Sequence, residues 1–289
     1  MSFRRPLLAA LASGGIAAFL LLTGHLPGLS AMGSAASSSP AFSGELTQGG
    51  WIRGTVPRGT RSLVLDGKPV DIASDGNWFA AFDRDAGPEA SLTMVAADGT
   101  ATTRQLLVAP RAWQIENVNI PRKPGGATEA FMAIRAPELA RIDAARRIRS
   151  DASGWRQRFI WPAKGRISGR FGSQRVYRGE PGSYHSGLDI ATGASGTPFV
   201  APADGVVILA AEQPFTLEGH LLMLDHGMGL NSAFLHCSAI LVKEGDHVKQ
   251  GQVIGRIGMT GRATGPHLHW SIKWRDARLD PLLFTGPMD

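Results

Sequence analysis

Hydrophobic and polar positions divide the chain into stretches of different kinds. An apolar run without charged residues covers residues 6–24 and directly follows Arg4 and Arg5. Over residues 45–120, and again from residue 161 onward, short runs rich in β-branched, aromatic and aliphatic residues alternate with glycine, proline and Asp-Gly turns. Short apolar runs bounded by turn residues are typical of β-strands. The pattern therefore predicts a mainly β protein that is preceded by an apolar N-terminal segment.

The apolar run at the N-terminus predicts an exported protein. Positive residues, a 19-residue apolar run and a small-residue stretch follow one another, which is the order found in secretory signal peptides. A run of this length also suffices to span a membrane as a helix. Residues 1–31 are therefore expected to be a cleaved signal peptide or a membrane anchor formed by residues 6–24, with the remaining chain in the periplasm or cell envelope. The serine- and alanine-rich residues 32–44 are expected to form a flexible linker.

Turn residues set the expected boundaries of the β-rich segments. Asp-Gly pairs, which favour hairpins, punctuate residues 45–120 and predict a small β-sandwich there. This segment contains no histidine, so a spacer or binding role is expected of it. Residues 121–158 are expected to be a linker, in which Pro137 opens a short basic helix that runs to about Ser150. A second β domain is expected over residues 159–289.

The net positive charge of the chain suggests a nucleic-acid partner, but the distribution of the charged residues along the sequence argues against it. Among the 289 residues, Lys and Arg number 30 and Asp and Glu number 24, which gives a net charge of +6. A surplus of +5 falls within residues 121–160, whereas residues 45–120 carry −2 and residues 161–289 carry +1. A nucleic-acid-binding domain concentrates basic residues on its own surface. Neither β-rich segment is therefore expected to bind nucleic acid.

The single cysteine, Cys237, limits the chemistry of any metal site or nucleophile. One cysteine excludes an internal disulfide framework, a cysteine-rich zinc module and a Cys-x-x-Cys redox pair. Any metal would therefore be bound by histidine and carboxylate. A cysteine nucleophile beside His236 is also disfavoured, because adjacent side chains on a strand point to opposite faces, which would turn Cys237 into the core.

Seven of the eight histidines lie within residues 161–289, and two short patterns among them suit metal binding. His185 and Asp189 are four positions apart, so an imidazole and a carboxylate can converge on a helix or on a strand. His267 and His269 are two positions apart, so both would point to one face of a strand. Three nitrogen and oxygen ligands with one open position describe a catalytic zinc site. Spacing does not decide which member of the second pair would bind the metal, and His236 is a further candidate.

Three longer segments carry a resemblance to a known family. They read YHSGLDIATGASGTPFVAPADGVV, LLMLDHGMGLNSAFLHCS and VKEGDHVKQGQVIGRIGMTGRATGPHLHW. Over residues 159–281 the chain resembles the lysostaphin/LytM-type zinc metallopeptidases, which are murein endopeptidases with the duplicated hybrid motif fold. The resemblance implies a two-sheet, mostly antiparallel β domain that hydrolyses peptide bonds of bacterial peptidoglycan.

The resemblance also implies a role for each candidate residue. His185, Asp189 and His269 would be the ligands of one Zn2+ per chain. His236 and His267 would be catalytic histidines that do not bind the metal, and the sequence does not decide which of them is the base.

The complete set of five residues favours a zinc-dependent endopeptidase that cuts the peptide cross-links of peptidoglycan, with a metal-activated water as nucleophile. Its partners would be the stem peptides of peptidoglycan, and the sequence identifies no regulatory protein partner. The alternative is a catalytically silent family member that binds murein and activates or tethers other wall hydrolases. A lipoyl-like carrier hairpin over residues 242–255 is a weaker reading, because no modifiable lysine lies at its tip. One departure from the family pattern is Phe234, where the family often has tyrosine.

Overall fold

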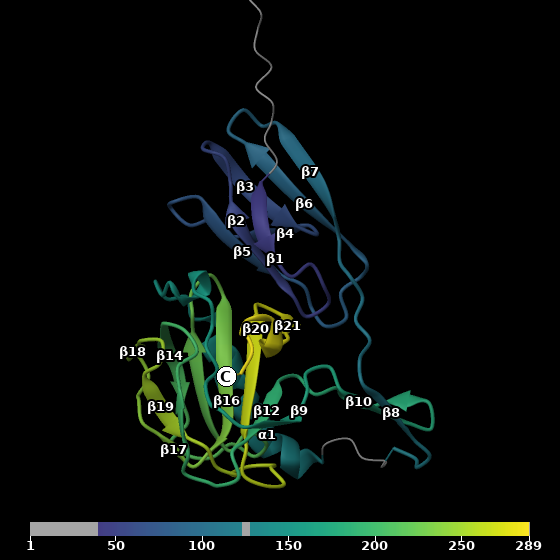
Figure 1. The fold of residues 1–289 in the computed structure, drawn as a ribbon, viewed down its shortest axis with the longest axis vertical. Coiled ribbons are helices and arrows are strands. Elements are labelled where there is room, and N and C mark those ends of the chain that lie inside the picture. Colours follow the sequence, from purple (N-terminus) through teal and green to yellow (C-terminus); the bar gives the residue numbers. More distant parts are fainter. Residues whose placement is uncertain (1–39, 123–127, 289) are drawn as a thin grey trace, which may run out of the picture. The chain divides into compact units, whose positions relative to one another are not determined.

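The computed structural model describes residues 40–122 and 128–288, and the signal peptide or anchor expected at residues 1–31 lies outside them. These described residues belong to one compact unit, whose course is drawn in Figure 1. They are mainly β, as the sequence predicts. Within them, no helix is both long and apolar enough to cross a membrane.

Residues 41–107 form two antiparallel sheets around an apolar core. One sheet has the strand order β1–β2–β5 and the other β4–β3–β6–β7. The strands are β1 (Ala41–Gly44), β2 (Trp51–Thr55), β3 (Thr60–Leu65), β4 (Lys68–Val70), β5 (Asn77–Ala81), β6 (Glu89–Ala96) and β7 (Ala101–Leu107). Leu63, Trp78 and Leu92 are fully buried and belong to one hydrophobic cluster. Two sheets joined by such a core make the predicted small β-sandwich.

Strand β1 differs from the flexible linker expected over residues 32–44 at its last four residues, 41–44, while residues 32–39 lie outside the described residues. Its residues pair with β2 in antiparallel register, with Ala41 opposite Thr55. The Phe42 ring packs edge-on against the buried Trp78 ring. A lone aromatic residue in a serine-rich stretch therefore anchors the strand, because burying its ring against another aromatic outweighs the disordering composition around it.

Helix α1 (Glu129–Arg147) begins earlier than predicted, and Pro137 lies inside it rather than at its start. The N-cap is Thr128, whose side-chain oxygen accepts a hydrogen bond from the Phe131 N–H. Such a cap satisfies one of the free donors in the first turn. A proline within a helix removes one backbone donor, and the cap and the alanine-rich sequence offset that loss. A short 3-10 helix, η1 (Gly154–Arg156), follows.

The C-terminal region is built on an eight-stranded antiparallel sheet and a smaller three-stranded one. The large sheet has the order β18–β14–β15–β16–β20–β12–β9, with β21 paired to β20, and the small sheet has the order β13–β19–β17. The strands are β9 (Arg166–Gly169), β12 (Leu188–Ala191), β13 (Pro198–Val200), β14 (Gly205–Ala210), β15 (His220–Asp225), β16 (Leu230–Cys237), β17 (Ala239–Ile240), β18 (His247–Val248), β19 (Val253–Arg256), β20 (Leu268–Trp274) and β21 (Ala277–Leu279), followed by the 3-10 helix η2 (Pro281–Leu283). Phe199 and Phe234 are fully buried and stack with ring centroids 5.3 Å apart. The predicted two-sheet antiparallel fold is therefore confirmed, and Phe234 serves as a core residue.

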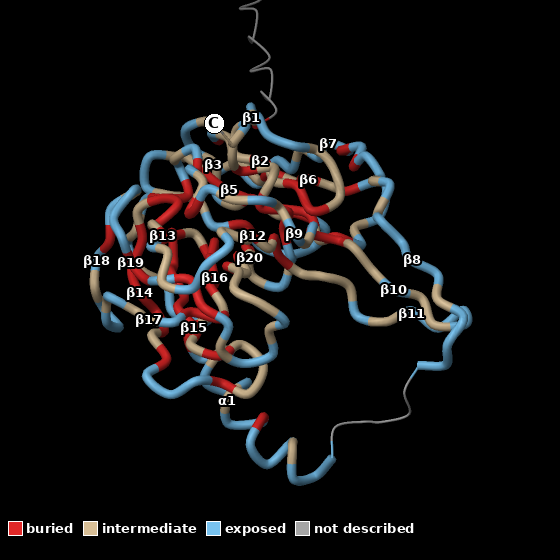
Figure 2. The backbone as a smooth tube through the Cα atoms, turned by 60° about the horizontal axis from the view of Figure 1, so that its bottom comes forward, coloured by how far each residue is buried: buried red, intermediate tan, exposed pale blue. Residues whose placement is uncertain are grey.

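A further three-stranded sheet joins distant parts of the sequence. Strand β8 (Ile115–Val118) pairs in parallel with β10 (Gln174–Tyr177), and β10 pairs with β11 (Glu180–Pro181). We call these three strands the arm; its backbone is mostly exposed or half-buried in Figure 2. From the sequence, residues 115–118 are expected to belong to the first β segment, and this pairing is not predicted. Parallel strands far apart in sequence leave no hairpin signal.

Candidate metal centre and active site

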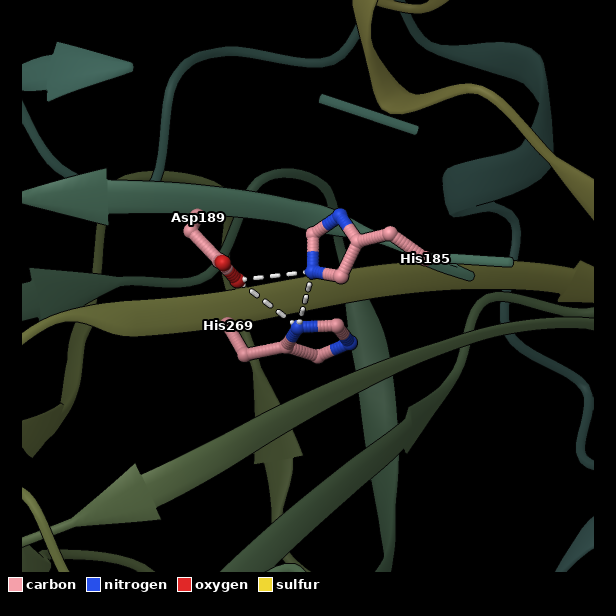
Figure 3. Close-up of side chains that lie close together, drawn as sticks. All are labelled: His185, Asp189 and His269. Carbon is pink, nitrogen blue, oxygen red and sulfur yellow. Dashed lines mark hydrogen bonds and ion pairs between the residues drawn. The ribbon is translucent and has the colours of Figure 1, made fainter. Parts of the chain in front are cut away.

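The three predicted metal ligands lie close together. Two of them are on the paired strands β12 and β20, and the third is just before β12. Asp189 on β12 lies directly opposite His269 on β20 in antiparallel register. His185 precedes β12, and its side chain points to the same place as the other two (Figure 3). Local spacing thus places His185 beside Asp189, and sheet pairing adds His269, which is 80 residues away in the sequence.

The three donor atoms are close enough to share one metal ion. The distance from His185 Nε2 to Asp189 Oδ1 is 3.0 Å, from His269 Nδ1 to Asp189 Oδ1 2.8 Å, and from His185 Nε2 to His269 Nδ1 3.1 Å. Tetrahedral zinc with bonds of about 2.0–2.1 Å places any two of its ligand atoms about 3.3 Å apart. Two imidazole nitrogens and one carboxylate oxygen at this spacing fit a zinc ion with small adjustments.

A backbone carbonyl sets the tautomer of His185. The distance from His185 Nδ1 to the Arg170 carbonyl oxygen is 3.0 Å. Because a carbonyl oxygen only accepts hydrogen bonds, Nδ1–H is the donor, and Nε2 of the neutral ring keeps its lone pair. That lone pair faces the point between Asp189 and His269. The second nitrogen of a metal-binding histidine is held in this way in many zinc sites.

Burial and the shared carboxylate together set the charge of the cluster. Burial opposes protonation of His185, but the hydrogen bond to Asp189, the charge of that carboxylate and the Arg170 carbonyl together outweigh it and raise the pKa of this imidazole. The protonated ring donates from Nε2 to Asp189, whereas the neutral ring keeps its lone pair there. Burial also opposes ionisation of Asp189, but hydrogen bonds from His185 and His269 hold the pKa of its carboxyl well below the usual range. Burial lowers the pKa of His269 despite the nearby carboxylate. An ionised carboxylate between two imidazoles is a donor set that suits a divalent cation.

His236 and His267 lie beside this cluster without joining it. Their ring centroids are 4.9 Å apart. His236 Nδ1 donates to the Thr260 carbonyl oxygen and His267 Nδ1 to the Gly265 carbonyl oxygen, each at 2.8 Å. Nε2 of each neutral ring is therefore available to accept a proton. Burial lowers the pKa of His236, which favours this neutral form.

The three candidate ligands lie beside a cavity and a groove that share lining residues. A cavity of about 370 Å3 is lined by residues that include His236, His267 and His269. A groove of about 1170 Å3 runs from the cluster along the arm. Tyr184 and His185 line both spaces, so the candidate metal centre lies where cavity and groove meet. An open groove beside such a centre can accommodate an extended chain.

Three groups that orient the histidines could not be predicted from the sequence. They are the backbone carbonyls of Arg170, Thr260 and Gly265. Every residue has a carbonyl, so no residue type marks these positions in the sequence.

Close packing around Asp189 leaves no room for a side chain on the neighbouring strand. Gly169 on β9 pairs with Asp189, and a Cβ atom added to Gly169 would lie 2.3 Å from Asp189 Oδ2. The same Cβ would lie 3.1 Å from His185 Cε1. Contacts this short require the carboxylate to move.

Gly169→Ala is therefore expected to lower zinc affinity about 10–100-fold, the range seen when the support of a metal ligand is disturbed. Competition with a zinc-binding dye measures this affinity. Gly87→Ala is the matched control, because an added Cβ there meets no atom closer than 3.9 Å. Equal zinc affinity for both variants would show that Asp189 does not depend on this packing.

The single cysteine, Cys237, and the buried His226 have structural roles rather than catalytic ones. Cys237 is fully buried, and burial raises the pKa of its thiol to about 12, which makes it unsuitable as a nucleophile. His226 is also fully buried, with its ring nitrogens 2.8 Å from the Asp204 carbonyl oxygen and from Ser232 Oγ. Burial lowers the pKa of His226 to about 4, so it packs as a neutral ring.

An antiparallel two-sheet fold with a His-Asp-His cluster at the head of a groove is the arrangement expected of a β-sheet metallopeptidase. The model for peptidase family M23 matches residues 183–281. A solved structure from Pseudomonas aeruginosa described as a peptidase M23 is 30% identical, with a TM-score of 0.64, and the match covers 84% of this chain and 96% of that one. The chain belongs to peptidase family M23.

Two relatives with assigned activities match a shorter part of the chain. Peptidoglycan DD-endopeptidase ShyA of Vibrio cholerae is 38% identical over 136 residues, which is 46% of this chain and 30% of that protein. DD-carboxypeptidase/endopeptidase Mpg of Neisseria meningitidis is 37% identical over 126 residues, which is 42% of this chain and 27% of that protein. Each match therefore spans less than a third of the relative's length.

Proposed function

We propose that the protein is a zinc-dependent endopeptidase that hydrolyses the peptide cross-links of bacterial peptidoglycan. The observation that carries this proposal is the convergence of His185 Nε2, Asp189 Oδ1 and His269 Nδ1 within 3.1 Å of one another at the head of a groove. Relatives named as peptidoglycan DD-endopeptidases support the substrate class.

The three donor atoms would hold one zinc ion, and His236 and His267 would move protons. Bound zinc supplies a Lewis acid and lowers the pKa of water to about 7. At Nε2, one of the two rings would take up the proton of the attacking water. A ring that carries a proton on Nε2, either this one after the transfer or the other one, would then give a proton to the leaving amine. Thr260 and Gly265 hold the two rings through their carbonyl oxygens, so the proton-accepting nitrogens stay in place.

The groove would bind the stem peptide on either side of the bond that is cut. Of the groove arginines, Arg175 already pairs with Glu116 at 2.7 Å, whereas Arg170 is exposed on the groove wall beside His185. A guanidinium in that position suits a carboxylate of the peptide. Because peptidoglycan lies outside the cytoplasmic membrane, the proposal includes export directed by residues 1–31.

Digestion of isolated, cross-linked murein by the zinc-loaded protein tests this function. Soluble fragments whose masses correspond to opened peptide cross-links and intact glycan are the expected products. A chelator should stop their release and added zinc should restore it. A zinc-loaded protein that releases nothing contradicts the proposal, and one that instead binds murein and stimulates a second hydrolase would be the catalytically silent alternative.

A further inference from the structure

Helix α1 is fastened to a short loop by a buried ion-pair network. Arg135 donates from Nη1 and Nη2 to the two carboxylate oxygens of Glu218, each at 2.6 Å, and from Nη1 to Glu138 Oε2 at 2.8 Å. Glu138 Oε1 accepts from both the N–H and the hydroxyl of Thr216, at 2.6 and 2.7 Å. The Arg135 side chain is only 8% exposed. The helix therefore holds residues 215–219 at two points.

The same loop forms a wall of the cavity that contains the catalytic candidates. The Glu218 carbonyl oxygen accepts the N–H of His236 at 2.8 Å, and the Leu217 carbonyl oxygen accepts the N–H of Arg262 at 3.0 Å. Leu217 and Glu218 line the cavity together with His236 and His267. A displacement of residues 215–219 would therefore reach His236 directly through its backbone.

The backbone at His236 needs such support. Its φ is +64°, in the left-handed region that residues with a side chain rarely adopt. The register between β15 and β16 also shifts between His220 and Leu222, at the end of the pair where His236 lies. Conformations of this kind are strained and persist only where the surroundings hold them. The hydrogen bond from His236 to Glu218 is one of these restraints.

Arg135 is the cation that lets two carboxylates share this buried place. Burial opposes ionisation of Glu138, but the hydrogen bonds from Arg135 and Thr216, together with the charge of Arg135, outweigh it and lower the pKa of Glu138. The side chains of Glu138 and Glu218 are 13% and 16% exposed. Without the guanidinium, these two carboxylates would face each other with little solvent, and they would separate or take up a proton. Either change would release the loop.

We infer that Arg135 is a positioning residue, through which helix α1 and the loop of residues 215–219 hold His236 in its working orientation. The inference rests on the proposed function, in which His236 moves a proton. It gives the basic helix a part in the active site, in place of the linker role expected from its sequence. The three candidate metal ligands lie on β12, on β20 and just before β12. A change at Arg135 should therefore leave zinc binding unaffected.

Arg135→Gln, compared with Arg147→Gln, tests this inference in the full chain. Arg147 is an exposed residue in the last turn of the same helix. In Arg135→Gln, kcat on a soluble cross-linked muropeptide should fall about 10–100-fold, because a small displacement of a catalytic group has effects of that size. KM should stay within about twofold, and zinc content should stay near one per chain. Arg147→Gln should match the wild type in all three.

The 15N signals of the His236 imidazole give a readout independent of turnover. In the wild type they should show a proton held on Nδ1, and in Arg135→Gln they should move toward a mixture of tautomers. Arg135→Lys should recover little, since an ammonium cannot make the two-pronged contact with Glu218. Should Arg135→Gln not fold, Glu218→Gln serves in its place, because it keeps the shape and weakens the same contact.

Wild-type kcat and wild-type His236 signals in a folded, zinc-loaded Arg135→Gln or Glu218→Gln would overturn the inference. Loss of zinc in parallel with loss of kcat would overturn it as well, since the effect would then reach the metal cluster. A wild type without turnover would contradict the proposed function alone, and the His236 signals would still decide the role of Arg135.

Discussion

Replacing Asp189 with alanine should remove zinc from the purified protein and lower murein hydrolysis at least about 10⁴-fold, because water is then no longer activated at neutral pH. Asp189 Oδ1 is the atom that both imidazoles approach, at 3.0 Å from His185 Nε2 and 2.8 Å from His269 Nδ1. It also supplies the negative charge of the cluster. Two neutral imidazoles left without it would bind a divalent cation weakly. Metal analysis and fragment release from murein measure the two effects.

Asp276→Ala is the control for this variant. Asp276 is an exposed residue next to the end of β20, the strand that carries His269, so its loss removes an acidic side chain without touching the cluster. It should keep zinc and full activity. An Asp189→Ala protein that still holds one zinc per chain and digests murein would show that the metal is bound elsewhere, and the proposed function would lose its main support.

The residues of the candidate site could be predicted from the sequence, but the strand pairing that brings them together could not. Four-residue and two-residue spacings identified His185, Asp189 and the His267/His269 pair, because side-chain direction along a strand has a fixed period. That Asp189 lies opposite His269 depends on the pairing of β12 with β20, which local spacing does not encode. The choice of His269 as a ligand came from family resemblance, and the structure places its Nδ1 in the cluster while His267 Nε2 stays 3.8 Å from Asp189.

Individual contacts that composition does not encode also explain the differences in the fold. Composition predicted a linker at residues 41–44, where one aromatic ring anchors a strand. A proline rule predicted the start of the helix at Pro137, where the Thr128 cap sets an earlier start. The burial of Cys237 followed from strand alternation, although His236 next to it has a φ of +64° that strand geometry does not provide. In the first two cases a single contact outweighed a rule that holds on average.

His236→Ala and His267→Ala should behave differently from Asp189→Ala. Neither ring belongs to the metal cluster, so both variants should keep about one zinc per chain while kcat falls about 10²–10⁴-fold, the usual contribution of a group that transfers a proton. His247→Ala is the matched control, because His247 is exposed on β18. Zinc loss in either variant, or an unchanged kcat, would remove that histidine from the proposed mechanism.

The two histidine variants can also be told apart by the leaving group of the substrate. A residue that protonates the leaving amine becomes dispensable when the amine is replaced by a group that departs without a proton, such as an activated ester. A residue that takes the proton of water stays necessary for both substrates. Activity on the ester should therefore return in one of the two variants only, and that variant identifies the acid. The short distance between the rings, 4.9 Å between centroids, allows one residue to cover partly for the other, so the double variant should lose less than the product of the two single losses.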